Sequence, residues 1–326
     1  MSKTVSVVVP VYNRSHILPE CLENLVNQTL QNIEIILVND ASTDNTLSVI
    51  KQYEARYPEQ IRAINSLQNM GPGGARNLGI ESAAGEFIGF TDSDDIADTT
   101  MYEKLYQTAL ASGYDIIDCG YYCQEKDLAI LHTPDSCTGV LNDEKRKELI
   151  VSGGYIFSKL YRKEIFENPN LRFRQNVILE DADFLTYLYA TANSIGNLKE
   201  ILYFYRNEPN SASKILDTNK YYHNIYEAIL HIHRKTCSLA NYHYIQPAIE
   251  YELVQMYSYG VNICLRAYKN HEQLDVIALL RQLAHLKSKV VENSYENPYV
   301  QNKITPLDIG IMQLNDLSPE ELIKLI

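Results

Sequence analysis

The sequence predicts an α/β fold, with a doubly wound, mostly parallel sheet flanked by helices and a C-terminal helical unit. Two patterns support this fold class. From residue 4 to residue 205, short β-branched runs alternate with segments of helical spacing, which is typical of β-α-β units. After residue 216 the strand pattern fades and long amphipathic stretches follow. We therefore expect a ligand-binding α/β domain over residues 1–216 and a helical domain over residues 217–326.

The strands and helices of the first domain follow from local patterns. Residues 4–11 are a near-continuous β-branched run, as expected of a strand buried on both faces of a parallel sheet. Residues 15–29 carry apolar side chains at helical spacing, with Pro19 in the first turn. Further strands are expected at residues 33–38, 61–66, 86–91, 115–121 and 201–205. Further helices are expected at residues 43–53, 74–84, 101–111, 143–151 and 180–191.

The second domain is expected to be helical. Amphipathic stretches cover residues 221–239, 245–268 and 272–291. Ser318 and Glu321 form the pattern of a capping box, with Pro319 at the first helical position. The apolar residues that follow would either seal this domain or pack against another subunit. The sequence therefore leaves open a homo-oligomer formed through the C-terminal helices.

Composition and charge exclude several classes of protein. The chain has 326 residues, 45% apolar and 21% charged, so it can bury a full core. Its net charge is −12, and residues 1–100 carry 13 acidic and 6 basic side chains, which argues against nucleic-acid binding. Six scattered cysteines, with no Cys-x-x-Cys pair and no signal-peptide pattern, predict a reduced, cytoplasmic protein. No apolar run approaches the ~20 residues that cross a bilayer, so any contact with the inner face of the plasma membrane is expected to be peripheral.

Polar residues follow the first two expected strands. The first strand leads into Pro10, Tyr12 and Asn13, and the second ends at Asp40. A carboxylate at the mouth of a strand can accept the imide N–H of uracil, and a neighbouring aromatic ring can stack on the base. An Asp just before a helix is also a common cap, and this alternative applies more to Asp44 than to Asp40.

Residues 69–77, Asn-Met-Gly-Pro-Gly-Gly-Ala-Arg-Asn, are a glycine-rich turn that feeds a helix. Glycines let backbone N–H groups approach a ligand, and the positive helix end with Arg76 would favour a diphosphate. The glycines also suit an ordinary loop and helix start. The third glycine of a dinucleotide fingerprint is missing, so a Rossmann dehydrogenase is disfavoured.

The strand at residues 86–91 delivers Asp92, Asp94 and Asp95 at its carboxyl end. Three carboxylates within four residues repel one another unless a cation or solvent shields them, so this turn invites a hard divalent ion. Mg²⁺ or Mn²⁺ fits best, because Mg²⁺ is typically held by one or two carboxylates together with substrate phosphates. The alternative is an exposed acidic turn in which Asp95 or Asp98 caps the next helix.

Residues 5–13, 38–44, 74–80 and 85–95 together resemble glycosyltransferase family two, which has the GT-A fold. Residues 158–162, residues 179–184, and Tyr203-Phe-Tyr-Arg206 with Ser211 resemble bacterial members that build or decorate surface polysaccharides, including teichoic acids. The resemblance covers residues 4 to about 214 and therefore implies that residues 1–216 form a nucleotide-sugar-binding catalytic domain. No matching motif is found in the helical remainder.

The resemblance implies a role for each matching residue. Pro10, Tyr12 and Asp40 would hold uridine, and Arg76 would lie near the diphosphate. Asp94 would bind the metal, with Asp92 on the ribose or in the metal shell. Arg206 and Ser211 would contact the donor. Asn39 stands where many members have a second Asp, which weakens the assignment of the uracil contact to Asp40.

Glu180 and Asp181 match the family's acidic pair at the start of a helix. The resemblance implies that Asp181 is the catalytic base and that Glu180 contacts an acceptor or donor hydroxyl. A base in this position takes the proton of an acceptor hydroxyl as its oxygen attacks the anomeric carbon opposite the diphosphate, which inverts the configuration. Without the resemblance, two acids that open a helix are most often complements of its dipole.

The sequence thus predicts an inverting, metal-dependent glycosyltransferase, a hexosyl- or N-acetylhexosaminyltransferase that uses a UDP-sugar. Its acceptor would be a carbohydrate or polyol-phosphate, such as a cell-surface polysaccharide, teichoic acid or glycolipid. The alternatives are a nucleotidyltransferase that makes nucleotide sugars and a non-catalytic relative that binds sugar nucleotide or polysaccharide. Among the 25 tyrosines, Tyr257 and Tyr259 are candidates for an acceptor groove, although packing between helices would also explain them.

Overall fold

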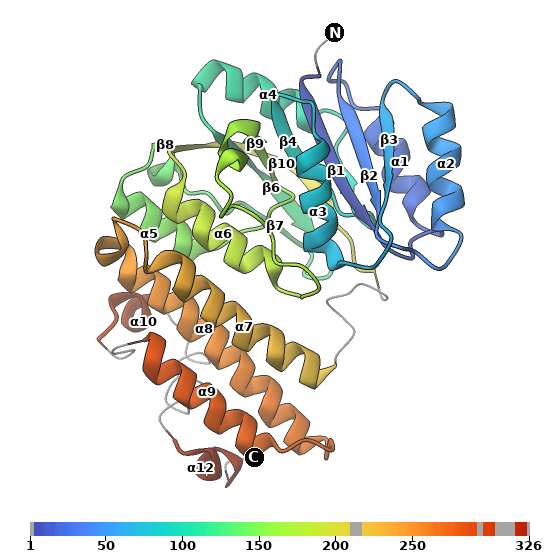
Figure 1. The fold of residues 1–326 in the computed structure, drawn as a ribbon. Helices are drawn as coiled ribbons and strands as arrows, with labels where there is room; N and C mark the ends of the chain where they lie inside the picture. Colours follow the sequence, from blue (N-terminus) through green and yellow to red (C-terminus); the bar gives the residue numbers. More distant parts are fainter. Residues whose placement is uncertain (1–2, 209–216, 292–295, 304–316, 325–326) are drawn as a thin grey trace. The chain divides into compact units, whose positions relative to one another are not determined.

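The computed structural model describes residues 3–208, 217–291, 296–303 and 317–324 (Figure 1). The chain forms two compact units. The first comprises Met1–Asn142 and Ser152–Ala212, and the second comprises Asp143–Val151 and Ser213–Ile326. The second unit therefore takes in a short segment that we had expected to belong to the first domain.

This segment is most of helix α5 (Asp143–Ser152). Its first residue is tied to the second unit, because Asn241 Nδ2 donates a hydrogen bond to Asp143 Oδ1 at 3.0 Å. The apolar side chains Leu149 and Ile150 are buried. The position of these residues in the sequence predicts that the helix belongs to the first domain. Its contacts in the folded chain assign it to the second unit.

The first unit is built on one sheet, whose described strands number ten; eight of them run in the order β3-β2-β1-β4-β9-β6-β10-β5. The strands are β1 (Val5–Val11), β2 (Glu34–Asn39), β3 (Ile61–Asn65), β4 (Phe87–Phe90), β5 (Ile96–Ala97), β6 (Ile116–Cys123), β7 (Leu128–Ile130), β8 (Gly139–Val140), β9 (Lys159–Arg162) and β10 (Ser194–Tyr205). Strands β3, β2, β1 and β4 are parallel, as are β6 and β10. The mostly parallel sheet expected from the sequence is therefore confirmed.

Strand β9 is the main departure from the expected topology. It lies between β4 and β6 and is antiparallel to both. We had treated these residues only as part of a motif. The strand is four residues long and begins with Lys159, so neither its length nor its polarity separates it from a loop. Two short strands, β7 and β8, pair with β6 and β10 outside the main order.

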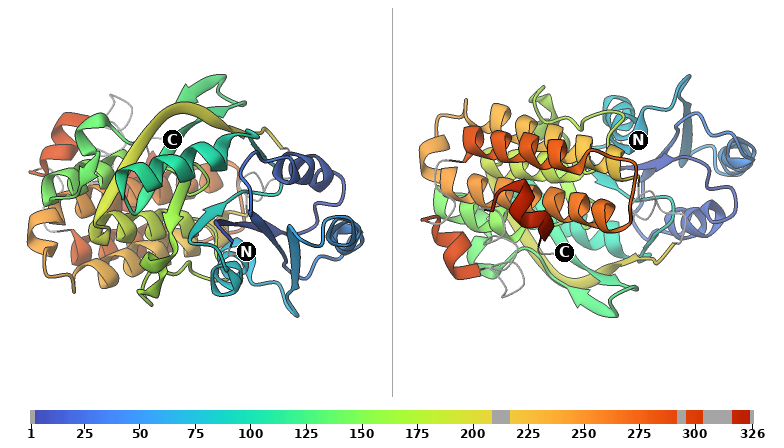
Figure 2. Two further views of the ribbon diagram at one scale, coloured as in Figure 1. Left: turned by 90° about the horizontal axis from the view of Figure 1, so that it is seen from above. Right: turned by 90° about the horizontal axis from the view of Figure 1, so that it is seen from below.

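Helices cover both faces of this sheet (Figure 2). The helices of the first unit are α1 (Leu18–Val26), α2 (Thr46–Arg56), α3 (Gly71–Ser82), α4 (Met101–Ser112) and α6 (Glu180–Thr191), with short 3₁₀ turns at Asp135–Cys137 and Lys163–Glu167. In β1, Val7 and Val9 share a buried cluster with residues of α1 and α4, whereas Val8 contacts α3 at Gly79. Because both faces of β1 are covered, its sequence is a continuous apolar run.

The second unit is helical, as expected. Besides α5 it contains α7 (Thr218–Thr236), α8 (Tyr242–Lys269), α9 (Val276–Val290), α10 (Pro298–Lys303) and α12 (Pro319–Lys324). Helices α7, α8 and α9 pack side by side (Figure 1). The capping box is present, because Ser318 N donates to Glu321 Oε2 at 2.8 Å and Glu321 N donates to Ser318 Oγ at 3.2 Å. Among the described residues, no helix combines the length and apolarity that a bilayer crossing requires.

Candidate active site

Three loops meet at the carboxyl edge of the sheet, after β1, β2 and β4. The parallel register sets Val11 beside Asn39, and Val8 beside Phe90, so the residues that follow these strands are neighbours. Asn13 ties the first two loops together, because its Oδ1 accepts the backbone N–H of Thr43 at 2.8 Å. The acidic turn, which we define as residues 92–95, follows β4 at the same edge. The structure therefore brings together residues that lie far apart in the sequence.

Asp40 is buried beneath this edge, with 2% of its surface exposed. Its Oδ1 accepts the backbone N–H of Met70 at 2.8 Å, so it links the end of β2 to the start of α3. Burial raises the pKa of Asp40, against the backbone hydrogen bonds from Met70 and Gly71. Pro10 pairs with Val38 inside the sheet, while Tyr12 at the end of β1 is 43% exposed. Tyr12 and Asp40 therefore follow neighbouring strand ends, and their role in holding uridine stays a prediction.

Two further residues of the second loop have local structural roles. Asp44 Oδ1 accepts the N–H of Thr46 at 2.9 Å, and its Oδ2 accepts the Ser15 hydroxyl at 2.7 Å. Burial raises the pKa of Asp44, but these hydrogen bonds outweigh it and lower the pKa to about 2. Asn39 accepts from Ser42 N and donates to Asn65 Oδ1. Both side chains thus stabilise the loop; Asp44 lies one residue before Asn45, which is the N-cap residue of α2.

The three carboxylates of the acidic turn face different partners. Asp92 Oδ1 accepts from Arg76 Nη2 at 2.7 Å, and Asp94 Oδ2 lies 3.5 Å from Arg14 Nη2. Burial and the nearby Asp92 raise the pKa of Asp94. Asp95 is 1% exposed, and burial followed by its two acidic neighbours raises its pKa well above the usual range. The turn therefore crowds three carboxylates together, and their mutual repulsion and burial disfavour ionisation of Asp94 and Asp95.

Asp95 anchors the turn to β10. Its Oδ2 accepts the hydroxyl of Tyr203 at 2.8 Å, and its Oδ1 accepts the backbone N–H of Arg206 at 2.9 Å. It does not cap α4, whose N-cap residue is Thr100; Asp98 accepts the N–H of Thr100 at 2.9 Å, in the turn before the helix. Asp95 is thus a structural residue, and Asp92 and Asp94 remain as candidates for ligand binding.

Arg206 lies at the acidic turn, where we expected a donor-binding residue. Its Nε donates to the backbone oxygen of Asp94 at 2.7 Å, and its Nη1 pairs with Glu20 of α1. Its buried Nη2 has no hydrogen-bond partner among the described residues. Ser211, the other residue expected from this motif, lies outside the described residues.

The first turn of α6 brings three acids to the same region. Glu180 Oε1 accepts from Arg76 Nη1 at 2.6 Å, and Asp183 Oδ2 lies 3.2 Å from Arg174 Nε. Asp181 forms no ion pair with any residue that the structure describes; its Oδ1 accepts the N–H of Ala182 at 3.0 Å. Asp181 is thus the acid of this turn that has no ion-pair partner among the described residues.

Burial raises the pKa of both expected site acids of α6. For Glu180 the pKa rises to about 7, with Arg76 opposing the effect of burial. The pKa of Asp181 is raised by burial, Arg76 opposes this rise, and Asp92 adds to it. A carboxylate with a raised pKa is a stronger base when it is ionised.

The acidic turn suits a metal that is completed by a substrate. Within the described ranges, no group of three or more His, Cys, Asp or Glu side chains is arranged to hold a metal ion. Asp92 and Asp94 supply hard oxygen donors, and their mutual repulsion together with burial favours a cation beside them. Two carboxylates plus phosphate oxygens are the usual ligands of Mg²⁺ in proteins. The side chains present therefore fit Mg²⁺ or Mn²⁺ bound together with a diphosphate.

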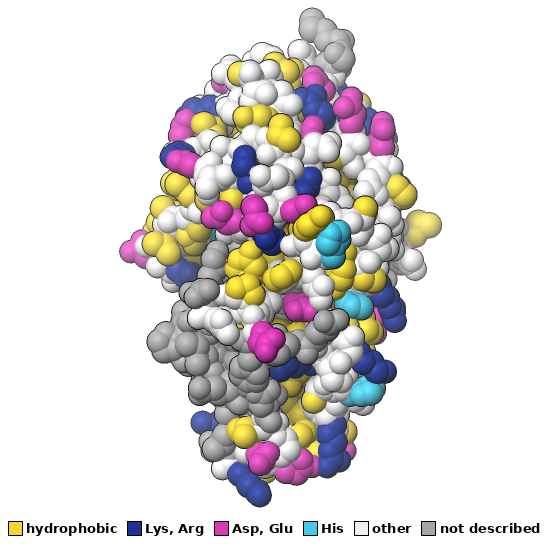
Figure 3. Space-filling view, turned by 90° about the vertical axis from the view of Figure 1, so that its left-hand side faces the viewer, with side chains coloured by type: hydrophobic (Ala, Val, Ile, Leu, Met, Phe, Trp, Pro, Cys, Tyr) yellow, Lys and Arg dark blue, Asp and Glu magenta, His cyan; other side chains and the backbone are white. Residues whose placement is uncertain are grey.

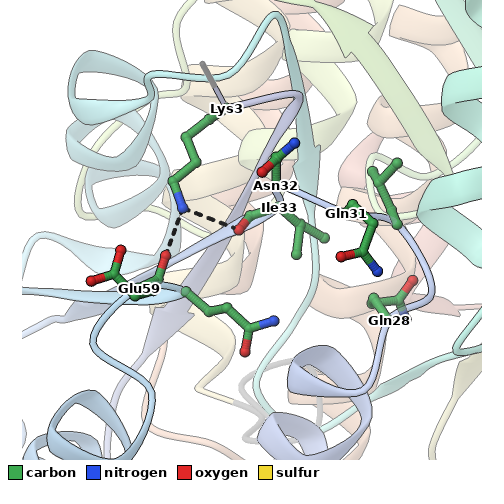
Figure 4. A pocket seen from close by; sticks show the side chains of 8 residues that line it. Lys3, Gln28, Gln31, Asn32, Ile33 and Glu59 are labelled. Carbon is green, nitrogen blue, oxygen red and sulfur yellow. Dashed lines mark hydrogen bonds between the residues drawn. The ribbon is translucent and has the colours of Figure 1, made fainter. Parts of the chain in front are cut away.

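A pocket at the other edge of the sheet is no rival for this site (Figure 4). It has a volume of about 400 Å³ and is lined by the segments that precede β1, β2 and β3. The amine of Lys3 donates to the backbone oxygen of Glu59 at 2.6 Å, so the cation there already has a partner.

On the face drawn in Figure 3, the described acidic and basic side chains are interspersed.

Sequence reasoning missed several residues of the site. The sequence patterns assign no role to Arg14, Tyr203 or Arg174, yet each contacts a carboxylate of the site. The position of Arg14, directly after the first strand, could have indicated it. Tyr257 is only 3% exposed, so its ring packs inside the helical unit, as the packing alternative has it, whereas Tyr259 is 46% exposed.

The family model "Glycosyl transferase family 2" matches residues 6–168. The chain is 36% identical over 223 residues to the uncharacterized glycosyltransferase EpsJ of Bacillus subtilis (strain 168), covering 66% of this chain and 64% of EpsJ. It is 31% identical over 228 residues to the minor teichoic acid biosynthesis protein GgaB of the same organism, covering 67% of this chain and 25% of GgaB. The chain thus spans less than two thirds of the length of these relatives.

The fold also resembles a solved structure. The crystal structure of S. aureus TarS 1–349 in complex with UDP-GlcNAc superposes with a TM-score of 0.70 at 20% identity, over 96% of this chain and 90% of that chain. This likeness supports the GT-A fold that the motifs implied. The chain belongs to glycosyltransferase family 2 and is related to bacterial glycosyltransferases that include a teichoic acid biosynthesis protein.

Proposed function

We propose that this protein is an inverting, metal-dependent glycosyltransferase that moves a hexosyl or N-acetylhexosaminyl group from a UDP-sugar to an acceptor hydroxyl. The observation that carries the proposal is the position of Asp181. It is the acid of the first turn of α6 that has no ion-pair partner among the described residues, and Arg76 links that turn to Asp92. Asp181 is therefore available as a base near the acidic turn, whose carboxylates suit a metal ion bound together with a diphosphate.

In this proposal the donor lies across the carboxyl edge of the sheet. Pro10, Tyr12 and Asp40 would hold the uridine, and Asp92 would contact the ribose or the metal. Arg206 would contact the donor through its unpartnered Nη2. Asp94, together with Asp92, would hold Mg²⁺ or Mn²⁺. Such an ion would neutralise charge that develops on the leaving diphosphate.

The chemical step is a single displacement. The carboxylate of Asp181 takes the proton from an acceptor hydroxyl, and the oxygen forms a bond to the anomeric carbon of the sugar. The bond from that carbon to the diphosphate breaks on the opposite face, UDP leaves, and the configuration is inverted. A positioned base of this kind contributes roughly 10²- to 10⁴-fold to the rate.

The relatives support the choice of substrates. TarS is seen with UDP-GlcNAc, and GgaB is named for teichoic acid biosynthesis. We propose that the acceptor is a cell-surface polysaccharide, a teichoic acid or a glycolipid, which places a carbohydrate or polyol-phosphate at the acceptor subsite. A cytoplasmic location, with peripheral contact at the inner face of the membrane, stays a prediction.

Replacement of Asp181 by Asn tests the role of this carboxylate. Since Asn cannot take a proton, we expect Asp181→Asn to lower kcat by ~10²- to 10⁴-fold while the Kd for UDP with Mn²⁺ stays within about threefold of its original value. The measurement is UDP release from a panel of UDP-sugars with oligosaccharide and polyol-phosphate acceptors. Because burial raises the pKa of Asp181, kcat of the unmodified protein should fall with acid at a higher pH than the usual range of Asp.

Glu81→Gln, a change of an exposed acid on α3, is the matched control and should leave kcat unchanged. Full turnover by the Asp181→Asn protein would exclude Asp181 as the base. Binding of nucleotide sugars without transfer to any acceptor in the unmodified protein would instead favour a non-catalytic sugar-nucleotide-binding protein.

A further inference from the structure

The glycine-rich start of α3 packs against the segment that leads into α6. Asn77 makes a reciprocal pair of hydrogen bonds with the backbone of Phe173, donating to its oxygen at 2.9 Å and accepting its N–H at 3.1 Å. Asn176 N donates to Met70 O at 2.6 Å. A Cβ built on Gly73 would lie 2.1 Å from the backbone oxygen of Arg174. The two segments therefore touch backbone to backbone, which gives Gly73 a packing role.

Arg76 joins the two halves of the site from within this contact. Its Nη1 donates to Glu180 Oε1 at 2.6 Å and its Nη2 to Asp92 Oδ1 at 2.7 Å. The side chains of Arg76 and Glu180 are 6% and 8% exposed, so solvent screens their bond little. Charge-assisted bonds of this kind are strong and directional. The buried guanidinium of Arg76 thus fixes Glu180 of α6 relative to Asp92 of the acidic turn.

The start of α6 needs such support. Leu179, which precedes the helix, has φ 62° and ψ 29°, in the left-handed region that disfavours a leucine. A strained conformation persists only where its surroundings hold it. Arg76 holds Glu180 on one side, and Arg174 holds Asp183 on the other, 3.2 Å from Nε to Oδ2. Asp181 lies between these two anchors in the sequence.

We propose that Arg76 is a positioning residue that holds Asp181 in a fixed position relative to the acidic turn. In this role Arg76 acts through Glu180 and Asp92 rather than by contact with the donor. Each of its terminal nitrogens already donates a hydrogen bond to a carboxylate of the protein, and its buried Nε has no partner among the described residues. This role replaces the diphosphate contact expected from the sequence. The inference rests on the proposed function, because it assigns Asp181 as the base.

A double-mutant cycle tests the positioning role. We expect Arg76→Gln to lower kcat on the order of 10²-fold, since a misplacement of about 1 Å at a catalytic group has this effect. The KM for the donor and the Kd for UDP should stay within about threefold. Because both residues act through one contact, Arg76→Gln/Glu180→Gln should be no slower than the slower single variant. Arg62→Gln, which removes an exposed arginine of β3, is the charge control and should leave kcat unchanged.

Two outcomes would overturn the proposal. If Arg76→Gln weakens UDP binding more than tenfold and leaves uridine binding unchanged, Arg76 contacts the diphosphate. If the losses of the two single variants multiply in the double variant, Arg76 does not act through Glu180. If Arg76→Gln does not fold, Arg76→Lys is the substitute variant, because it keeps the positive charge. The ammonium group of lysine cannot reproduce the planar pair of donors with which Arg76 bonds Glu180 and Asp92, so kcat should still fall with KM unchanged.

A readout without turnover separates this proposal from the proposed function. Arg76→Gln should speed hydrogen exchange at the amides of residues 184–187, which bond to the carbonyls of the first turn of α6. Unchanged exchange there would overturn the positioning role even in an active enzyme. If the unmodified protein transfers no sugar from any donor, the proposed function is wrong. The hydrogen-exchange result then still shows whether Arg76 holds the first turn of α6 in place.

Discussion

At the scale of single residues, the first unit contains a buried ion pair between Lys159 and Asp118 that further hydrogen bonds support. Lys159 is fully buried and its Nζ lies 3.0 Å from Asp118 Oδ1, while Ser158 and Thr133 donate hydroxyl hydrogen bonds to the same carboxylate at 2.7 and 2.6 Å. Lys159 also donates to the backbone oxygen of Tyr155 at 2.9 Å, in the loop before β9. Sequence motifs indicated that residues 158–162 matter, but not that this lysine is internal.

Loss of Lys159 should destabilise the protein strongly. Lys159→Met leaves Asp118 as a buried carboxylate without its cation, which typically costs about 3–5 kcal/mol. Unfolding in urea, followed by circular dichroism, measures the difference. The matched control is Lys199→Met, which breaks the exposed pair with Asp135 and should change the free energy of unfolding by less than about 1 kcal/mol. Equal effects of the two changes would mean that Asp118 is accommodated without a cation.

At the scale of elements, the glycine-rich start of α3 joins two parts of the active site. The sequence allowed two roles for these glycines, approach to a ligand or an ordinary helix start. Gly73 has a third role, because Arg174 O and Glu180 Cγ would lie 2.1 and 3.1 Å from a Cβ at this position. The close contact lets Arg76 of α3 reach Glu180 of α6.

Gly73→Ala should therefore impair both stability and turnover. The added methyl group forces α3 away from residues 173–180, and overpacking of this kind costs about 1–3 kcal/mol. We expect kcat to fall as well, because Arg76 and Glu180 move apart. Gly113→Ala is the control: Gly113 has φ +70° with nothing within 4 Å of an added Cβ. It should lose stability through backbone strain alone, with unchanged kcat; a Gly73→Ala enzyme with full kcat would show that the contact is dispensable.

At the scale of the whole molecule, the carboxyl edge of the sheet crowds acidic side chains together. Asp92, Asp94 and Asp95 lie within one turn, and the pKa values of Asp94 and Asp95 are raised by burial and by their acidic neighbours. A cation that binds with a nucleoside diphosphate relieves this repulsion in the folded state. Ligand binding is therefore expected to stabilise the whole catalytic unit.

Addition of UDP and Mn²⁺ should raise the melting temperature of the protein. At ~100 times its Kd, a ligand that binds only the folded state adds ~2.7 kcal/mol. We expect EDTA to remove the part of the shift that depends on Mn²⁺, and Asp94→Asn to abolish that part. Glu81→Gln should respond like the unmodified protein. A Mn²⁺-dependent shift that survives in Asp94→Asn would exclude Asp94 as the metal ligand.

The sequence by itself determined the α/β class, the helical C-terminal part, most of the helices and strands, and the family. These features depend on local patterns: buried parallel strands are near-continuous apolar runs, as in β1, and the apolar side chains of an amphipathic helix recur every 3.6 residues, as in α1. It also indicated that Asp40, Asp92 and Asp94 share one edge, because the carboxyl ends of parallel strands meet there.

Only the tertiary structure decided which side chains touch. It placed β9 antiparallel inside the sheet, moved α5 to the second unit, and set Arg76 between Asp92 and Glu180. It also separated Asp95, which anchors β10, from its two neighbours in the acidic turn. Such pairings join residues more than a hundred positions apart, as for Arg76 with Glu180. Local sequence patterns do not predict which distant residue a side chain will contact. Contacts of this kind form only when the chain closes on itself.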